Sequence, residues 1–354
     1  MEKVIAGIQQ IGIGNPNVKE ATDWYRKYFG MDIKVFDDEA TADLMLPYTG
    51  GKPHDRSATL TLSMRGGGGF EIWQYTSRTP VAADFDIQLG DLGINCAKIK
   101  SIDVKETFEQ FNMAGLKVLT SLSENPAGEL NFFVEDLNGN IFNVVNGLGW
   151  FKKKERKTTG GVTGAIIGCT DIDKSLSLYS DILGYDEVVY DEINTFADFN
   201  GLPGGDKEFR RVLLRESKPR EGAFSKLFGP TEIELIQLTG QRKPRKIFEN
   251  RYWGDLGFIH LCFDVQRMDA LKEECESAGF PFTVDSADSF DMGEAAGRFT
   301  YIEDPDGTLI EFVETHKVPI AKKLGLFVDM TKRDPTKDLP KWMLNALSFS
   351  RIKD

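Results

Sequence analysis

An internal repeat constrains this chain more than any other feature of its sequence. Residues 10–30 align without a gap with residues 164–184, and both copies are typical of a strand, a capped helix and a closing glycine. Further along, residues 90–96 align in the same way with residues 254–260. We therefore expect the fold to be built from repeated strand–helix units.

Each unit continues into more strands. Residues 71–76 match residues 234–239, and residues 134–145 match residues 302–313; all four stretches have the composition of strands. Together with the strand-like stretches between them, the repeats predict four β-α-β-β-β modules, two in each half of the chain. The fold class predicted from this pattern is α+β, with four modules forming two paired, curved open sheets.

The repeat also predicts the domain organisation. We expect an N-terminal domain of two modules over residues 1–150, a basic linker over 151–161, and a C-terminal domain of two modules over 162–316. The tail, residues 317–354, contains an amphipathic piece around Trp342, Leu344 and Leu347 that could dock as a helix. A tail that packs on the domains as a brace is favoured over a lid that covers a pocket.

The charge and the cysteines of the chain limit the classes of partner and the compartment that we expect for it. A formal net charge of −12 argues against nucleic acid or an anionic membrane as a partner, because the protein would repel phosphates. The chain has no apolar run of membrane length and no signal peptide, and its four cysteines are widely spaced, as in reduced cytosolic proteins. A cytoplasmic protein with a small-molecule substrate, either a monomer or a homodimer, is therefore expected.

Two polar residues occupy strands that are otherwise apolar. His260 is one of only three histidines and lies in a predicted strand, and Glu311 lies within an apolar strand that follows a turn. An unpaired carboxylate buried among apolar side chains would cost several kcal/mol. A metal ion or a hydrogen-bonded proton is therefore expected beside Glu311.

The repeated motifs give the chain a family resemblance. They are the strand–helix openings at Gln10 and Gly164, the Glu-Asp-x-x-Gly turns at Glu135 and Glu303, and the strand residues Glu71 and Glu234. With these motifs the chain resembles the vicinal oxygen chelate superfamily, which includes glyoxalase I, methylmalonyl-CoA epimerase, extradiol dioxygenases and bleomycin-resistance proteins. The resemblance implies curved sheets made of two modules, each able to hold a divalent metal ion on its concave face.

The metal ligands that this resemblance implies depend on which modules pair. If modules one and four pair, as in fused glyoxalases, the ligands are Gln10, Glu71, His260 and Glu311. If modules three and four pair, as in extradiol dioxygenases, they are Gly164, Glu234, His260 and Glu311, a set that lacks one histidine of the iron triad. We favour the first pairing, which leaves Cys96, Asn143, Gly164 and Glu234 as a decayed site.

The favoured ligands imply a chemistry. Two carboxylates, one imidazole and one amide suit one divalent ion, either Zn, Ni, Co, Mn or Fe. The resemblance then implies a glyoxalase-type lyase or isomerase in which the metal chelates vicinal oxygens and Glu311 or Glu71 acts as the general base that forms an enediolate. The alternatives are an Fe(II) ring-cleaving type of dioxygenase and a non-catalytic protein that binds a small molecule.

The identity of the substrate is not implied by the resemblance. The positions with which glyoxalases grip glutathione hold Gly14, Tyr75 and Leu256 in this sequence. None of these side chains carries the arginine or asparagine groups that the family uses there, which argues against glutathione as the carrier.

Overall fold

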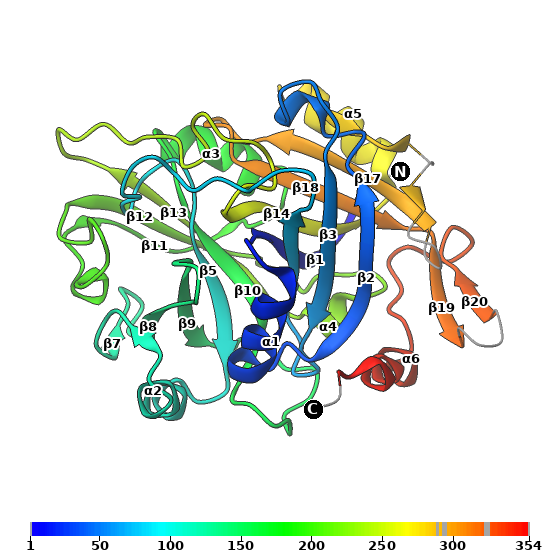
Figure 1. Ribbon diagram of the computed structural model, residues 1–354, viewed down its shortest axis with the longest axis horizontal. Helices are drawn as coiled ribbons and strands as arrows, with labels where there is room; N and C mark the ends of the chain where they lie inside the picture. Colours follow the sequence, from blue (N-terminus) through cyan, green and yellow to red (C-terminus); the bar gives the residue numbers. More distant parts are fainter. Residues whose placement is uncertain (1, 288–289, 292–295, 322–325, 353–354) are drawn as a thin grey trace.

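The computed structural model describes residues 2–287, 290–291, 296–321 and 326–352. In this part of the chain the strands form two nine-stranded sheets, here called sheet A and sheet B, and one separate two-stranded hairpin. Both large sheets are curved and open, and a few helices cover them (Figure 1). The predicted α+β class with paired, curved sheets is confirmed.

Sheet A combines the first and the fourth module. Its central contact is the antiparallel pairing of β1 with β14, flanked by the parallel neighbours β4 and β18. The strands are β1 (Val4–Gly14), β2 (Ile33–Thr41), β3 (Asp55–Leu62), β4 (Gly69–Tyr75), β14 (Gly257–Gln266), β15 (Val284–Asp285), β16 (Phe290–Asp291), β17 (Ala296–Glu303) and β18 (Leu309–Thr315). The associated helices are α1 (Val18–Phe29) and α5 (Met268–Ser277).

Sheet B combines the second and the third module around the antiparallel contact of β5 with β10. Its strands are β5 (Gly93–Ser101), β6 (Lys117–Val118), β7 (Ser123–Glu124), β8 (Leu130–Glu135), β9 (Ile141–Asn146), β10 (Thr159–Gly168), β11 (Glu187–Asn194), β12 (Phe209–Arg215) and β13 (Glu232–Leu238). The helices are α2 (Val104–Met113), α3 (Ile172–Tyr179) and the short α4 (Ser225–Phe228).

Each sheet therefore takes one module from each half of the sequence. This is the pairing of modules one and four that the sequence analysis favoured over the pairing of three and four. β10 begins at Thr159, inside the stretch that was expected to be the linker. The division into domains at residues 150 and 162 stays a prediction that follows the repeat.

The predicted helix caps are present. The Asn17 side chain accepts a hydrogen bond from the Glu20 amide and starts α1, and Asp171 does the same for the Lys174 amide at the start of α3. At the other end of α1, Gly30 adopts the left-handed conformation, with φ of 69°, which favours glycine. The same N-terminal capping therefore begins the equivalent helices of modules one and three, whereas α3 ends at Ser180 in a right-handed conformation.

Strand periodicity separates a core face from a concave face in each sheet. In β14, Leu261, Phe263 and Val265 join a single core that contains residues of both sheets, whereas the alternate residues His260, Cys262 and Asp264 lie outside that core. His260, Cys262 and Asp264 therefore lie on the opposite, concave face of sheet A. We call this face cup A, and the equivalent face of sheet B cup B.

The tail packs against the β2 edge of sheet A. It contains β19 (Lys317–Ala321), β20 (Leu326–Asp329) and α6 (Lys341–Ala346), and α6 lies near the lower end of β2 in Figure 1. Leu339 and Leu344 are buried in a cluster with Ile33 of β2 and Phe228 of α4. These contacts favour the brace. Trp342 does not dock as expected, because its face of the short helix points to solvent and it is 62% exposed.

Two buried tyrosines connect the sheets at equivalent positions of the repeat. Tyr25 of α1 donates a hydrogen bond to Asp136, and Tyr179 of α3 donates one of 2.9 Å to Asp304. In each case the helix belongs to one sheet and the aspartate to a strand connection of the other sheet. The two halves of the chain therefore use the same cross-sheet hydrogen bond.

Replacement of Tyr179 by Phe tests this contact. Because Tyr179→Phe leaves the buried Asp304 without one of its donors, we expect the free energy of unfolding to fall by about 1–3 kcal/mol. Urea denaturation of the variant measures the change, and Tyr28→Phe, at a partly exposed tyrosine of α1, is the control. Equal effects of the two substitutions would contradict the role given to the Tyr179 hydroxyl.

Candidate metal centre

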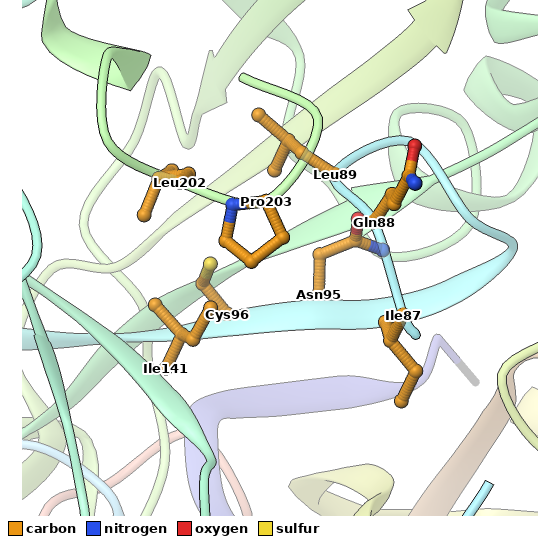
Figure 2. A pocket seen from close by; sticks show the side chains of 8 residues that line it. All are labelled: Ile87, Gln88, Leu89, Asn95, Cys96, Ile141, Leu202 and Pro203. Atoms are coloured by element: carbon orange, nitrogen blue, oxygen red, sulfur yellow. The ribbon is translucent and has the colours of Figure 1, made fainter. Parts of the chain in front are cut away.

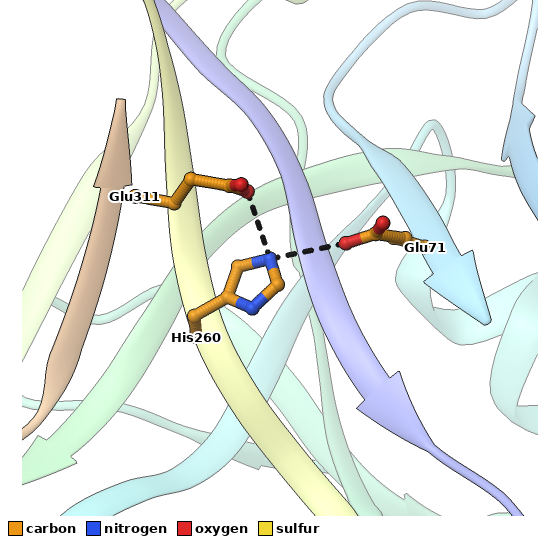
Figure 3. A group of neighbouring side chains, drawn as sticks. All are labelled: Glu71, His260 and Glu311. Atoms are coloured by element: carbon orange, nitrogen blue, oxygen red, sulfur yellow. Dashed lines mark ion pairs between the residues drawn. The ribbon is translucent and has the colours of Figure 1, made fainter. Parts of the chain in front are cut away.

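Three potential metal ligands converge in cup A. Glu71 of β4, His260 of β14 and Glu311 of β18 place their ligand atoms within 4.8 Å of one another (Figure 3). The Nε2 atom of His260 lies 3.0 Å from Glu311 Oε2 and 3.2 Å from Glu71 Oε2. The imidazole therefore lies between two carboxylates that come from opposite sides of the β1–β14 pair.

A glycine in β1 makes this meeting possible. Gly12 is paired with His260 across the antiparallel ladder and with Glu71 across the parallel one. A Cβ atom at Gly12 would lie 2.3 Å from a carbon of the imidazole ring, well inside van der Waals contact. The absence of a side chain at Gly12 therefore lets the imidazole cross over β1 towards Glu71.

Gln10 completes the group. Its amide nitrogen donates to Glu71 Oε2 at 3.2 Å and to Glu311 Oε2 at 3.5 Å, and the side chain is buried. A turn of the amide about its last bond would present the oxygen to the same place. The structure thus brings together all four residues of the favoured set, and their role as ligands stays a prediction.

The electrostatics of the group fit a divalent cation. Burial alone would lower the pKa of His260, but Glu311 and Glu71 outweigh burial and raise this pKa to about 9. Both carboxylates lie at ion-pair distance, yet Nε2 is buried without a well-directed hydrogen bond among the described residues. One nitrogen and two carboxylates around a common point form a ligand set that Zn and similar divalent ions accept.

Aromatic side chains surround the imidazole. The Trp253 ring stacks on the His260 ring, with centroids 6.2 Å apart and planes inclined by 9°. The hydroxyl of Tyr301 lies 3.4 Å from His260 Nδ1 and is also close to Glu311, whose charge, after burial, raises the pKa of the Tyr301 hydroxyl. Such a partner on the second ring nitrogen orients a histidine ligand.

The sequence analysis missed these aromatic residues. Trp73, which packs edge-on against Trp253, lies two residues after Glu71 in β4, so strand alternation places both on the same face. Trp253 precedes its strand, and no periodic signal identifies it.

A second missed residue lies further along the concave face. Asp264 is two positions beyond Cys262 and four beyond His260 in β14, and it is fully buried. Gln9 donates to its Oδ1 atom at 3.3 Å, whereas Oδ2 has no hydrogen-bond partner among the described residues. Burial raises the pKa of Asp264 to about 8, so the carboxyl is largely protonated at neutral pH.

Cup B contains a different arrangement at the equivalent positions. Glu234 forms ion pairs with Lys98, at 2.6 Å, and with Arg211, and Arg211 also pairs with Asp198 at 2.9 Å. Although burial opposes ionisation, Arg211 and Lys98 lower the pKa of Glu234 to about 2. The carboxylate is therefore already neutralised by side chains of the protein.

The other positions of cup B leave little space. Asn143 donates to Asn131, Gly164 has no side chain, and the cavity beside Cys96 measures about 20 Å³, room for one water (Figure 2). Phe199 belongs to the 3-10 helix Ala197–Phe199, and the centre of its ring lies 3.9 Å from the guanidinium carbon of Arg211. Cup B therefore does not offer the cluster of ligands that cup A offers.

Comparison with known proteins gives a family and a fold. The model of the Glyoxalase/Bleomycin resistance protein/Dioxygenase superfamily matches residues 7–144 and 162–312. No curated protein is detectably similar in sequence. No helix in the described part of the chain combines the length and apolar character needed to span a bilayer.

Two solved structures resemble the whole arrangement. Glyoxalase I from Zea mays is 13% identical with a TM-score of 0.53, and the match covers 88% of this chain and 92% of that one. A putative dioxygenase from Bacillus subtilis subsp. subtilis str. 168 is 16% identical with a TM-score of 0.55, and the match covers 88% of this chain and 86% of that one. At these identities the likeness shows the fold alone.

The buried carboxyl of Asp264 predicts a dependence of stability on pH. Its pKa of about 8 in the folded protein exceeds the value of about 3.9 expected in the unfolded chain. Between these values the folded protein binds a proton that the unfolded chain does not, so stability falls as the pH rises. In Asp264→Asn we expect the free energy of unfolding to fall less between about pH 5 and pH 8 than in the parent protein.

Urea denaturation at a series of pH values measures this difference. The exposed Asp206 provides the control variant Asp206→Asn, which should keep the pH dependence of the parent. Parallel curves for Asp264→Asn and the parent protein would contradict the protonated state given to Asp264.

Proposed function

Because the chain belongs to the Glyoxalase/Bleomycin resistance protein/Dioxygenase superfamily, we propose that cup A is the active site of a divalent-metal-dependent lyase or isomerase. The observation that carries the proposal is the convergence of Glu71, His260 and Glu311 in cup A. Gln10, Glu71, His260 and Glu311 would hold one ion of Zn, Ni, Co, Mn or Fe. When bound, the ion would supply polarisation of two adjacent substrate oxygens, which acidifies the neighbouring C–H bond.

The protein's own side chains would position and move the proton. Tyr301 holds the imidazole of His260 in orientation from the Nδ1 side. One of the two carboxylates removes a proton from a substrate carbon and returns it to the adjacent carbon. The Glu71 side chain is 15% exposed and that of Glu311 is 9% exposed, so Glu71 is the more open of the two carboxylates. We therefore favour Glu71 as the general base and Glu311 as the alternative.

The surroundings of the carboxylates support this chemistry. Trp73, Trp253 and Tyr301 are buried around the cluster, and Met45, from the connection between β2 and β3, packs in the same group. Apolar walls exclude water and strengthen the electrostatic interactions within the cup. The substrate that we propose is small, with adjacent oxygen atoms, and the protein would act on it as a monomer or a homodimer.

The dioxygenase alternative gains less support from the geometry. A two-histidine, one-carboxylate iron site needs a second imidazole. The cluster in cup A contains His260 alone, and the pairing of modules three and four that extradiol dioxygenases use does not occur in the described sheets. The experiment below distinguishes the proposed enzyme from a protein that binds its ligand without turnover.

Exchange of a carbon-bound proton with solvent tests the proposed chemistry. For the protein loaded with Zn or Mn, we expect deuterium from D₂O to replace a proton on the carbon next to the carbonyl of dihydroxyacetone. Proton NMR measures the rate of this exchange. Glutamine keeps an oxygen ligand but cannot act as a base. Glu71→Gln should therefore lower the exchange rate by about 10²–10⁴-fold while the variant retains its metal.

Glu311→Gln is the matched comparison in the same cluster. A larger loss of exchange in Glu311→Gln than in Glu71→Gln, at equal metal content, would assign the base to Glu311. A fully loaded parent protein that neither exchanges a proton of this α-hydroxyketone with solvent nor isomerises it would contradict the proposed reaction class for it.

A further inference from the structure

The concave face of sheet B ends in an open pocket with a volume of about 570 Å³. It lies beyond the ion pairs that fill the centre of cup B, at the ends where β5 and β12 stop and β10 and β13 begin. Its walls come from the segment after β9, the connection between β12 and β13, and the tail. None of the four candidate ligands of cup A lines it.

An arginine in the wall has unused hydrogen-bond donors. The guanidinium of Arg220 lies 4.8 Å from the centre of the Tyr185 ring. Its Nε and Nη2 atoms are buried, and neither finds an acceptor in the described part of the chain. Buried donors without acceptors cost free energy. The Arg220 side chain as a whole is only partly buried, so a turn of the guanidinium towards the pocket would let an anion there satisfy both atoms.

A buried lysine lies beneath the pocket. Lys100, on the concave face of β5, is fully buried and donates to the Gly149 carbonyl at 2.9 Å. Its ammonium lies 5.2 Å from the centre of the Trp150 ring, and a Cβ atom at Gly229 would lie 3.7 Å from it. Because Trp150 and Gly229 both line the pocket, the ammonium lies directly behind the wall.

No charge of the protein neutralises this lysine. Within the described residues, Lys100 forms no ion pair with a carboxylate, and burial lowers its pKa to about 7. Lys100 and Asp264 occupy equivalent positions of the two modules, so cup B has a basic side chain where cup A has a carboxyl.

The two acidic residues of the pocket are already engaged. Glu216 accepts a hydrogen bond of 2.9 Å from the Thr231 amide, and the charge of Arg220 opposes the rise that burial causes in the pKa of Glu216. Asp338 pairs with Lys226 and accepts from Ser225. Lys218, which also lines the pocket, is exposed. The free donors of the pocket are therefore mostly cationic, in a chain whose net charge is −12.

We propose that this pocket binds a small phosphate ester with a planar group, its phosphate at Arg220 and Lys218 and its planar group against Trp150. A dianion matches several cations better than a carboxylate does, because each added charge gains a further charge-assisted hydrogen bond. The indole of Trp150 offers a flat apolar wall for the remainder of the ligand. This site is independent of the function proposed for cup A.

Calorimetric titration of the full chain with phenyl phosphate tests the proposal. We expect saturable binding of one molecule per chain, tighter than the binding of inorganic phosphate or benzoate. Arg220→Gln should weaken it by about tenfold or more, because a charge-assisted contact is lost. Arg245→Gln removes the same charge from an exposed ion pair with Glu249 and should leave the affinity unchanged.

Two further variants separate the parts of the site. Lys218→Ala alters an exposed side chain that does not support the fold, so its weaker binding supports the site even if Arg220→Gln is unstable. Trp150→Leu should weaken the binding of phenyl phosphate and leave that of inorganic phosphate unchanged.

Three results would overturn the proposal. The first is no saturable binding at millimolar phenyl phosphate, and the second is binding that neither Arg220→Gln nor Lys218→Ala changes, which indicates an adventitious ion only. The third is benzoate binding as tight as that of phenyl phosphate, which contradicts the phosphate class.

Discussion

The antiparallel ladder between β1 and β14 determines which side chains meet in this protein. It joins the first module to the last, and it places Gly12 beside both His260 and Glu71. Because a Cβ atom at Gly12 would overlap the imidazole, the site depends on one position without a side chain. The buried carboxylates, the aromatic walls and the orientation of His260 are arranged around this crossing point.

The two cups show how one topology can produce opposite electrostatics. In cup A two carboxylates face one imidazole, and this excess of negative charge suits a divalent cation. In cup B the cations Lys98 and Arg211 already pair with Glu234, so the charges balance within the protein. Removal of one partner from such a buried pair is strongly unfavourable, which gives cup B a structural role.

Much of the fold and the candidate site could be predicted from the sequence. The repeat predicted the modules, and the caps at Asn17 and Asp171 followed from local chemistry. The spacing alone did not decide which modules pair, because equivalent modules open with similar strands; the family resemblance supplied the preference. Trp253 and the pairing of Arg211 with Asp198 could not be predicted, since both depend on side chains that meet through connections without periodicity.

The measurement that tests the account most directly is the metal content of the purified protein and two variants, determined by plasma mass spectrometry. His260→Ala removes the imidazole of cup A. Cys96, a small buried residue, occupies the equivalent position of cup B, and Cys96→Ala is the matched variant there. The account predicts about one divalent ion per chain, lost in His260→Ala and retained in Cys96→Ala. An ion retained in His260→Ala, or lost in Cys96→Ala, would contradict the assignment of the metal to cup A.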